Sequence, residues 1–184
     1  MTNLKDIKGT FAIDPEHSLL GFSARHAMVS KVHGSFRSFE GTAKGSVADP
    51  ANGKIFVTFR TDSIDTGNAK RDAHLRSADF FDSEQFPTGS FESTSIEVDD
   101  DELTVTGQLT LHGVTNPVTI PFEFGGAQVG PDGVLRIGFE GATTISRQQW
   151  GLTWNAALEA GGVMVKDKVK LEIEIEAVQQ SEEY

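Results

Sequence analysis

Apolar and polar residues alternate along most of this chain of 184 residues, and a period of two is typical of β-strands with one buried face. From Val169 to Ala177 the apolar positions alternate with lysines and glutamates, so the charged face of that strand must lie in solvent. Similar runs occupy residues 20–28, 55–60, 103–111, 118–124 and 135–145, with weaker runs near 10–13, 40–48 and 90–98. The pattern predicts an all-β fold of eight or nine strands.

Turn signals separate these runs. Residues 49–53, 99–101 and 131–133 are rich in Asp, Asn, Gly and Pro, and each suits a hairpin. Because short connections make consecutive strands antiparallel, we expect an antiparallel barrel or sandwich. One long interruption, residues 65–86, reads as locally helical, with Asn68 or Thr66 as its cap and Asp72 spaced to pair with Arg76.

Several positions predicted to face inward carry small residues. An eight-stranded barrel is either filled by its own side chains or just wide enough for one small ligand. Small inward residues suggest a cavity, whereas glycines in barrels also mark bends and bulges, and both interpretations stay open. The positions are Ala24, Gly41, Ala43, Gly45 and Gly107.

Charge and cysteine content exclude several classes of function. The 16 Lys and Arg residues are outnumbered by 27 Asp and Glu, which gives a net charge of −11 and disfavours nucleic acid and anionic membranes as partners. The chain has no cysteine, so thiolate catalysis, disulfides and Cys-ligated metals are excluded. No apolar run is long enough for a signal or a membrane-spanning helix, so we expect a cytoplasmic protein without membrane insertion, or a periplasmic or secreted one if a leader has been removed.

Motifs for nucleotide binding and serine hydrolysis are missing, and the five histidines include no close-spaced ligand pair, so we expect neither a catalytic group nor a metal site. His26 lies on an apolar face, where it is either a hydrogen-bonded core residue or an anchor for a ligand head group. Arg71 and His74 share one face of the expected helix, which either pins that helix to the barrel or forms a cationic patch at its mouth.

Short motifs throughout the chain follow the order found in one known family. They include Asp14-Pro15-Glu16-His17-Ser18, Val32-His33-Gly34-Ser35-Phe36, Arg71-Asp72-Ala73-His74-Leu75, Asp79-Phe80-Phe81-Asp82 and Gly107-Gln108-Leu109-Thr110-Leu111-His112-Gly113. Over about residues 11–178 the set resembles the YceI-like family, the bacterial polyisoprenoid-binding, lipocalin-like proteins. One departure is Gln149-Trp150, where family members more often carry Asp-Phe.

The resemblance implies a single domain over residues 1–184, an extended antiparallel eight-stranded lipocalin-like barrel with a short helical insertion near residues 66–82. It also implies non-catalytic binding, with transport or storage, of a long apolar amphiphile such as a polyisoprenoid, an isoprenoid quinone or a similar lipid. Relatives are associated with lipid transport and stress response. The expected ligand is this lipid alone, with no further cofactor.

For such a carrier we expect lumen-lining positions, entrance aromatics and polar head-group contacts. The lining candidates are Leu20, Phe22, Ala24, Phe36, Val57, Phe139 and Ile145; the entrance candidates are Phe80, Phe81 and Trp150; the head-group candidates are His26, Arg71 and His74. Two alternatives remain: an enzyme on a lipid-like substrate with His74 or His26 as base and Arg71 holding an anion, or a ligand-free interaction barrel, as a homodimer.

Overall fold

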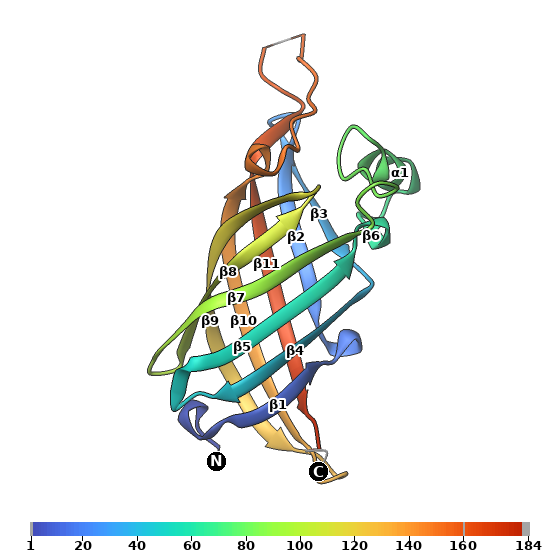
Figure 1. The fold of residues 1–184 in the computed structure, drawn as a ribbon. Coiled ribbons are helices and arrows are strands. Elements are labelled where there is room, and N and C mark those ends of the chain that lie inside the picture. The colour runs from blue at the N-terminus through green and yellow to red at the C-terminus, as the bar shows by residue number, and fades with distance from the viewer. Residues whose placement is uncertain (1, 160, 182–184) are drawn as a thin grey trace.

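The computed structural model describes residues 2–159 and 161–181, which form a closed antiparallel barrel with one short helix at its upper end (Figure 1). The strands are β1 (Lys8–Ile13), β2 (Leu19–His26), β3 (Ser30–Phe36), β4 (Phe39–Ser46), β5 (Asp49–Arg60), β6 (Ile64–Asp65), β7 (Thr88–Asp99), β8 (Glu102–Leu111), β9 (Val114–Val129), β10 (Leu135–Ser146) and β11 (Val165–Gln179). The helix is α1 (Ala69–Arg76), and the 3₁₀ turns are η1 (Leu4–Asp6), η2 (Pro15–His17), η3 (Thr61–Ser63) and η4 (Arg147–Trp150).

Eleven strand segments in the described chain make eight wall strands, because three wall strands are each interrupted once. β1 and β2 both pair with β11 on either side of η2, and the next wall strand is β3 with β4. β5 and β6 together form the third interrupted wall strand, and η3 lies between them. The barrel closes where Phe11 on β1 lies opposite Gln179 on β11. The predicted eight-stranded all-β barrel is therefore confirmed.

Two of the three expected hairpin turns are found where the sequence predicts them. Residues 99–101 join β7 to β8, and residues 131–133 lie between β9 and β10. The third prediction is wrong, since residues 49–53 belong to β5 and the chain reverses earlier, where Ser46 lies opposite Asp49. Pro50 is tolerated there because it lies near the first residue of a strand, where a missing N–H breaks no central ladder.

The helical insertion is present but shorter than the expected stretch of residues 66–82. Asn68 is the N-cap, and its side chain accepts a hydrogen bond from the Arg71 amide at 3.0 Å. Thr66, the other candidate cap, instead donates its amide to Asp72 Oδ1 at 2.9 Å. The Asp72 carboxylate is buried by this contact and turned away from Arg76, so the expected pair between them is not among the ion pairs of the described residues.

Two hydrophobic clusters close the two ends of the barrel. The upper cluster contains Trp150 from η4, and the lower one contains Leu4 and Ile7 beside η1. Leu4 and Trp150 each keep only 1% of their surface exposed. The first residues of the chain therefore form a plug under the barrel, a role that their alternating charges did not predict.

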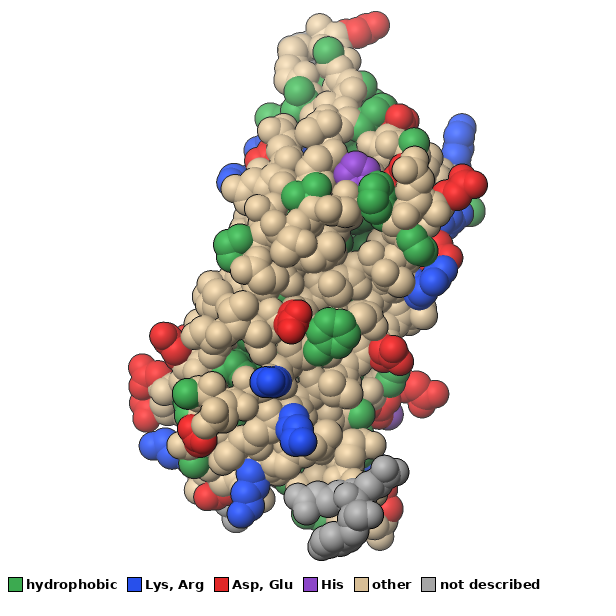
Figure 2. Space-filling view, viewed as in Figure 1, with side chains coloured by type: hydrophobic (Ala, Val, Ile, Leu, Met, Phe, Trp, Pro, Cys, Tyr) green, Lys and Arg blue, Asp and Glu red, His purple; other side chains and the backbone are tan. Residues whose placement is uncertain are grey.

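The outer wall carries the charge, and the inner wall is apolar. On β11, Lys170 and Glu174 are exposed, whereas Leu171 and Ile173 face the lumen, as the alternation predicts. Figure 2 shows acidic and basic side chains interspersed over the outside of the barrel. None of the helices that the structure describes has the length and apolar character needed to cross a bilayer.

Candidate ligand-binding site

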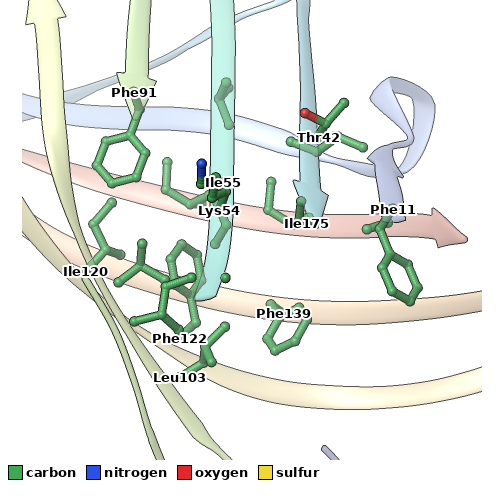
Figure 3. Close-up of a pocket in the computed structure, with 18 of the residues that line it drawn as sticks. Phe11, Thr42, Lys54, Ile55, Phe91, Leu103, Ile120, Phe122, Phe139 and Ile175 are labelled. Atoms are coloured by element: carbon green, nitrogen blue, oxygen red, sulfur yellow. The ribbon is translucent and has the colours of Figure 1, made fainter. Parts of the chain in front are cut away.

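An apolar cavity of about 270 Å³ runs inside the barrel between the two plugs. Figure 3 shows Phe11, Phe91, Phe122 and Phe139 reaching into the same space from β1, β7, β9 and β10. Ligand pockets in proteins occupy roughly 300–1,000 Å³, so the space lies just below that range. The barrel is therefore not filled by its own side chains.

Glycines let the lumen aromatics lie flat against the wall. Phe59 lies opposite Gly89 in the β5–β7 pair, and a Cβ added to Gly89 would be 2.2 Å from Phe59 Cζ. The same arrangement places Phe22 on Gly34 and Phe122 on Gly141. Because these rings rest against the sheet, the centre of the lumen stays open.

Of the small residues expected to face inward, Ala43 and Gly45 border the cavity, whereas Ala24, Gly41 and Gly107 are not among its lining residues. A Cβ on Gly107 would lie 2.4 Å from Phe91 Cζ, and one on Gly41 would lie 2.5 Å from Ile13 Cδ1, so these glycines leave room for a neighbouring side chain. Gly45 instead has a φ of +145° at the register shift between Lys44 and Ser46, so it marks an irregularity of the sheet.

Five of the seven expected lining residues border the cavity: Leu20, Phe22, Phe36, Val57 and Phe139. Ala24 and Ile145 do not. Ala24 lies further up β2, between Val32 and Val169, and Ile145 packs against the upper hydrophobic cluster. The cavity ends below both residues because the upper plug occupies that part of the barrel.

The three expected entrance aromatics close the upper end and do not border an open mouth. Trp150 is fully buried, and its Nε1 donates a hydrogen bond to the Leu109 carbonyl at 2.8 Å. Phe81 meets the Phe36 ring edge to face at 5.5 Å, and Phe80 packs beside Trp154 at 5.2 Å. A ligand in the cavity would reach the outside at this end only if these rings moved.

The three expected head-group residues lie around one shallow hollow beside α1. His26, Arg71 and His74 line it together with Asn68 and Lys70, and these five lining residues include no carboxylate. Such a hollow offers N–H donors and positive charge to an anionic or hydrogen-bond-accepting group.

Hydrogen bonds fix the orientation of two of these side chains. Arg71 donates from Nε to Thr66 Oγ1 and from Nη2 to the Thr66 carbonyl, both at 2.7 Å. His74 Nε2 lies 2.8 Å from Asp79 Oδ2. An oriented His–Asp pair can serve as a base, but the residues lining the hollow include no Ser or Thr hydroxyl to act as a nucleophile.

A short side-chain contact separates the hollow from the lumen. A Cβ placed on Gly34 would lie 2.5 Å from Phe22 Cζ and 2.8 Å from Thr66 Cγ2. Phe22 borders the cavity, and Thr66 accepts the hydrogen bonds of Arg71. The polar hollow and the upper part of the apolar cavity therefore lie on either side of one layer of side chains.

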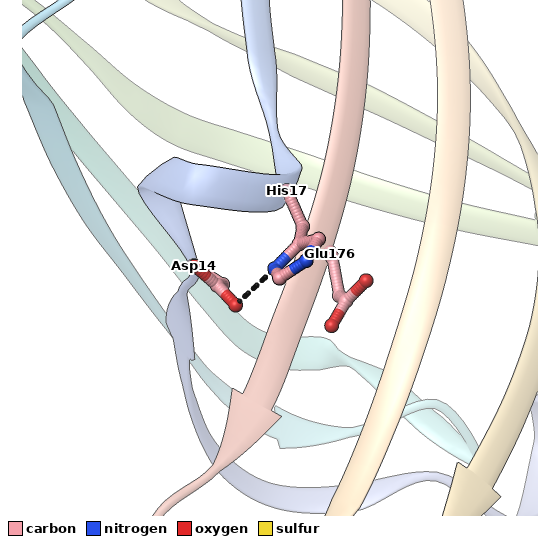
Figure 4. A group of neighbouring side chains, drawn as sticks. All are labelled: Asp14, His17 and Glu176. Carbon is pink, nitrogen blue, oxygen red and sulfur yellow. Dashed lines mark hydrogen bonds and ion pairs between the residues drawn. The ribbon is translucent and has the colours of Figure 1, made fainter.

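A separate ionic cluster joins β1, β2 and β11 outside the barrel, where Asp14, His17 and Glu176 meet (Figure 4). Their donor atoms lie within 4.8 Å of one another, so they could in principle hold a cation. Asp14 is already engaged, because its carboxylate caps η2 at the Glu16 amide and lies 2.8 Å from His17 Nδ1. We therefore interpret the cluster as a structural joint across the break between β1 and β2.

The charged groups of this joint shift each other's pKa values. The hydrogen bond from His17 lowers the pKa of Asp14, and the Asp14 carboxylate, assisted by Glu176, raises the pKa of His17 above 6.5. Sequence reasoning missed the joint because Glu176 comes from the far end of the chain.

The sequence of this chain is similar to those of known proteins. The model of the YceI-like domain matches residues 11–177. The chain belongs to the YceI-like family. A UPF0312 protein of Staphylococcus aureus is 41% identical over 167 residues, which cover 90% of this chain and 95% of that protein.

Solved structures agree with the fold. The crystal structure of the YceI protein of Campylobacter jejuni has a TM-score of 0.71 and 30% identity, over 85% of this chain and 90% of that one. A polyisoprenoid binding domain from Saccharophagus degradans has a TM-score of 0.68 over 92% of this chain and 98% of that one. At 13% identity, the second likeness shows the shared barrel fold alone.

Proposed function

We propose that this protein binds a long apolar amphiphile, such as a polyisoprenoid, an isoprenoid quinone or a similar lipid, in its lumen without transforming it. The apolar cavity between the two plugs carries the proposal. Each buried methylene contributes about 0.8 kcal/mol before association costs, so a chain filling the cavity needs no other source of affinity. The Saccharophagus degradans neighbour, described as a polyisoprenoid binding domain, supports this ligand class. Transport or storage of the lipid would follow from such binding.

In this proposal His26, Arg71 and His74 contact the head group while Phe22 covers the nearest part of the tail. The closeness of the hollow and the cavity on either side of Gly34 supports this arrangement. The absence of a hydroxyl nucleophile among the residues lining the hollow favours binding over hydrolysis. The volume of the cavity favours a carrier over a ligand-free interaction barrel.

Native mass spectrometry of protein purified from its natural host tests the proposal, followed by solvent extraction of any bound molecule. We expect a discrete adduct that is released as a polyprenyl or quinone-like lipid. An unmodified mass that persists after incubation with such lipids would contradict it.

A matched pair of variants tests where the ligand sits. Ala43 borders the cavity, whereas Ala142 is exposed on the outer face of β10. We expect Ala43→Phe to abolish the adduct by filling the lumen and Ala142→Phe to keep it. Equal retention by both variants would place the ligand elsewhere.

A further inference from the structure

The barrel wall is incomplete between β5 and β7. Among the residues that the structure describes, these strands pair only between Phe56, opposite Glu92, and Arg60, opposite Thr88. Beyond Phe56, β5 pairs with β4 alone, and beyond Ser93, β7 pairs with β8 alone after a register shift. We call this unpaired stretch, residues 49–55 of β5 and 93–99 of β7, the seam.

Side-chain contacts across the seam hold it shut. The Ile55 amide donates a hydrogen bond to Ser93 Oγ at 2.8 Å. Further along, Ile96 leans across from β7, and a Cβ placed on Gly53 would lie 2.9 Å from Ile96 Cδ1. Gly53, Ile55 and Ile96 all border the cavity, so these contacts separate the lumen from the outside.

A second unpaired stretch, residues 114–121 of β9 and 142–146 of β10, is covered by η4, whose Gln149 carbonyl accepts a hydrogen bond from Asn116. The ends and the fully paired walls offer no easier route. Opening either end would expose a hydrophobic cluster that includes Leu4 at the lower end or Trp150 at the upper end, each 1% exposed. Opening the wall between fully paired strands, such as β8 and β9, would break a continuous ladder of backbone hydrogen bonds. Parting the seam breaks no backbone ladder; it separates the Ser93 hydroxyl contact and the Ile96 contact, and it shifts Val98, which packs against the edge of the lower cluster.

We propose that the seam is a lateral portal through which the apolar tail of the ligand enters and leaves the lumen, with Ile96 closing over Gly53 as its gate. This inference rests on the proposed function and adds the route of exchange. Because the tail passes sideways between two strands, the buried side chains of Leu4 and Trp150 stay in place during exchange.

A reversible crosslink across the seam tests the portal. The register of β5 on β7 places Ile55 opposite Ser93, so an Ile55→Cys, Ser93→Cys variant brings two thiols together in a chain with no other cysteine. The probe is retinol, a fluorescent isoprenoid alcohol, and the signal is energy transfer from the tryptophans. Loaded protein is mixed with excess lipid vesicles, and the release rate is compared for the oxidised and reduced forms.

We expect oxidation to slow release at least about tenfold and to leave the equilibrium affinity for retinol nearly unchanged, because a gate alters the barrier more than the bound state. The matched control is Thr106→Cys, Thr119→Cys, whose hydroxyls lie 2.9 Å apart on the paired strands β8 and β9. Oxidation of this control should leave release unchanged. Equal rates for the oxidised and reduced seam variant would overturn the portal and leave the proposed function intact.

A second variant tests the gate without a crosslink. Ile96→Ala removes the side chain that covers Gly53, so we expect faster release of retinol than from Ile175→Ala, which truncates a lumen residue on β11 away from the seam. Equal release from the two variants would overturn the gate. Failure of the reduced and unmodified proteins to bind retinol would overturn the proposed function, and the portal with it.

Discussion

Single glycines decide whether this barrel is hollow. At Gly89, the missing side chain is the space that the Phe59 ring occupies, and Gly34 and Gly141 do the same for Phe22 and Phe122. With any larger residue at these positions, the ring would have to turn into the lumen. The volume available to a ligand therefore depends on residues that never need to touch it.

We expect Gly89→Ala to lower the free energy of unfolding by about 1–3 kcal/mol, since overpacking forces the Phe59 ring off its position. Gly138→Ala is the control, because the nearest atom to its added Cβ is the Ile175 carbonyl oxygen at 3.9 Å. Urea unfolding followed by circular dichroism measures both variants. A Gly89 variant as stable as the Gly138 variant would contradict the role given to this glycine.

A second prediction at the residue scale concerns His17. Its pKa is raised by Asp14, so its contribution to stability is complete below pH 6.5 and is lost as the pH rises through the raised value. The pKa of Asp14 is lowered by the same hydrogen bond, so its contribution is present above pH 3.8 and is lost as the pH falls through the lowered value.

The titration of His17 can be followed by NMR. We expect Asp14→Asn to bring its pKa back toward 6.5, and Glu16→Gln, which removes a carboxylate from the same turn, to change it much less. An equal effect of the two variants would show that general charge, and not the hydrogen bond, sets the pKa.

At the scale of elements, the 3₁₀ turn η4 closes the upper end of the barrel. Trp150 stands where the family more often has Phe, and its indole adds a hydrogen bond to the Leu109 carbonyl. The Gln149 side chain is exposed, and the backbone carbonyl of Gln149 accepts a hydrogen bond from Asn116 Nδ2. Arg147 is buried and donates to the carbonyls of Lys166 and Val165, which ties η4 to the start of β11.

We expect Trp150→Phe to lower the free energy of unfolding by about 1–3 kcal/mol, because the buried Leu109 carbonyl loses its indole partner and the smaller ring leaves a void. Trp154→Phe, a half-buried site near His74, should cost less. Denaturant unfolding measures both variants, and their midpoints are compared at equal m-values. A larger loss of free energy of unfolding in the Trp154 variant would contradict this account of η4.

Regular elements could be predicted from the sequence, whereas their interruptions could not. Alternation identified the wall of the barrel, and one of the two candidate caps, Asn68, marks the start of α1, because both signals are local. The plug under the barrel was missed, since Leu4 is buried in a cluster that includes Ile137 and Ala177, which are distant in the chain. The seam was missed for the same reason: residues 49–60 of β5 do not reveal at which residue their partner strand departs.

At the scale of the whole molecule, the closed lumen sets a limit on ligand length. With about 270 Å³ available, affinity should rise with each isoprene unit from geraniol to farnesol to geranylgeraniol until the space is filled. We expect at least about a tenfold gain per unit before the limit, given about 0.8 kcal/mol gross per buried methylene. Competition against retinol measures the series, and an affinity independent of length would contradict binding in the lumen.

The pairing of β1 with β11 has a consequence for biosynthesis. Phe11 and Gln179 come from opposite ends of the chain, so the wall is finished only after the last strand has left the ribosome. Until then β10 and the first strands present open edges that invite pairing with other chains. Such distant contacts also make folding slow. A nascent chain therefore has no lumen, and the proposed ligand can enter only the finished molecule.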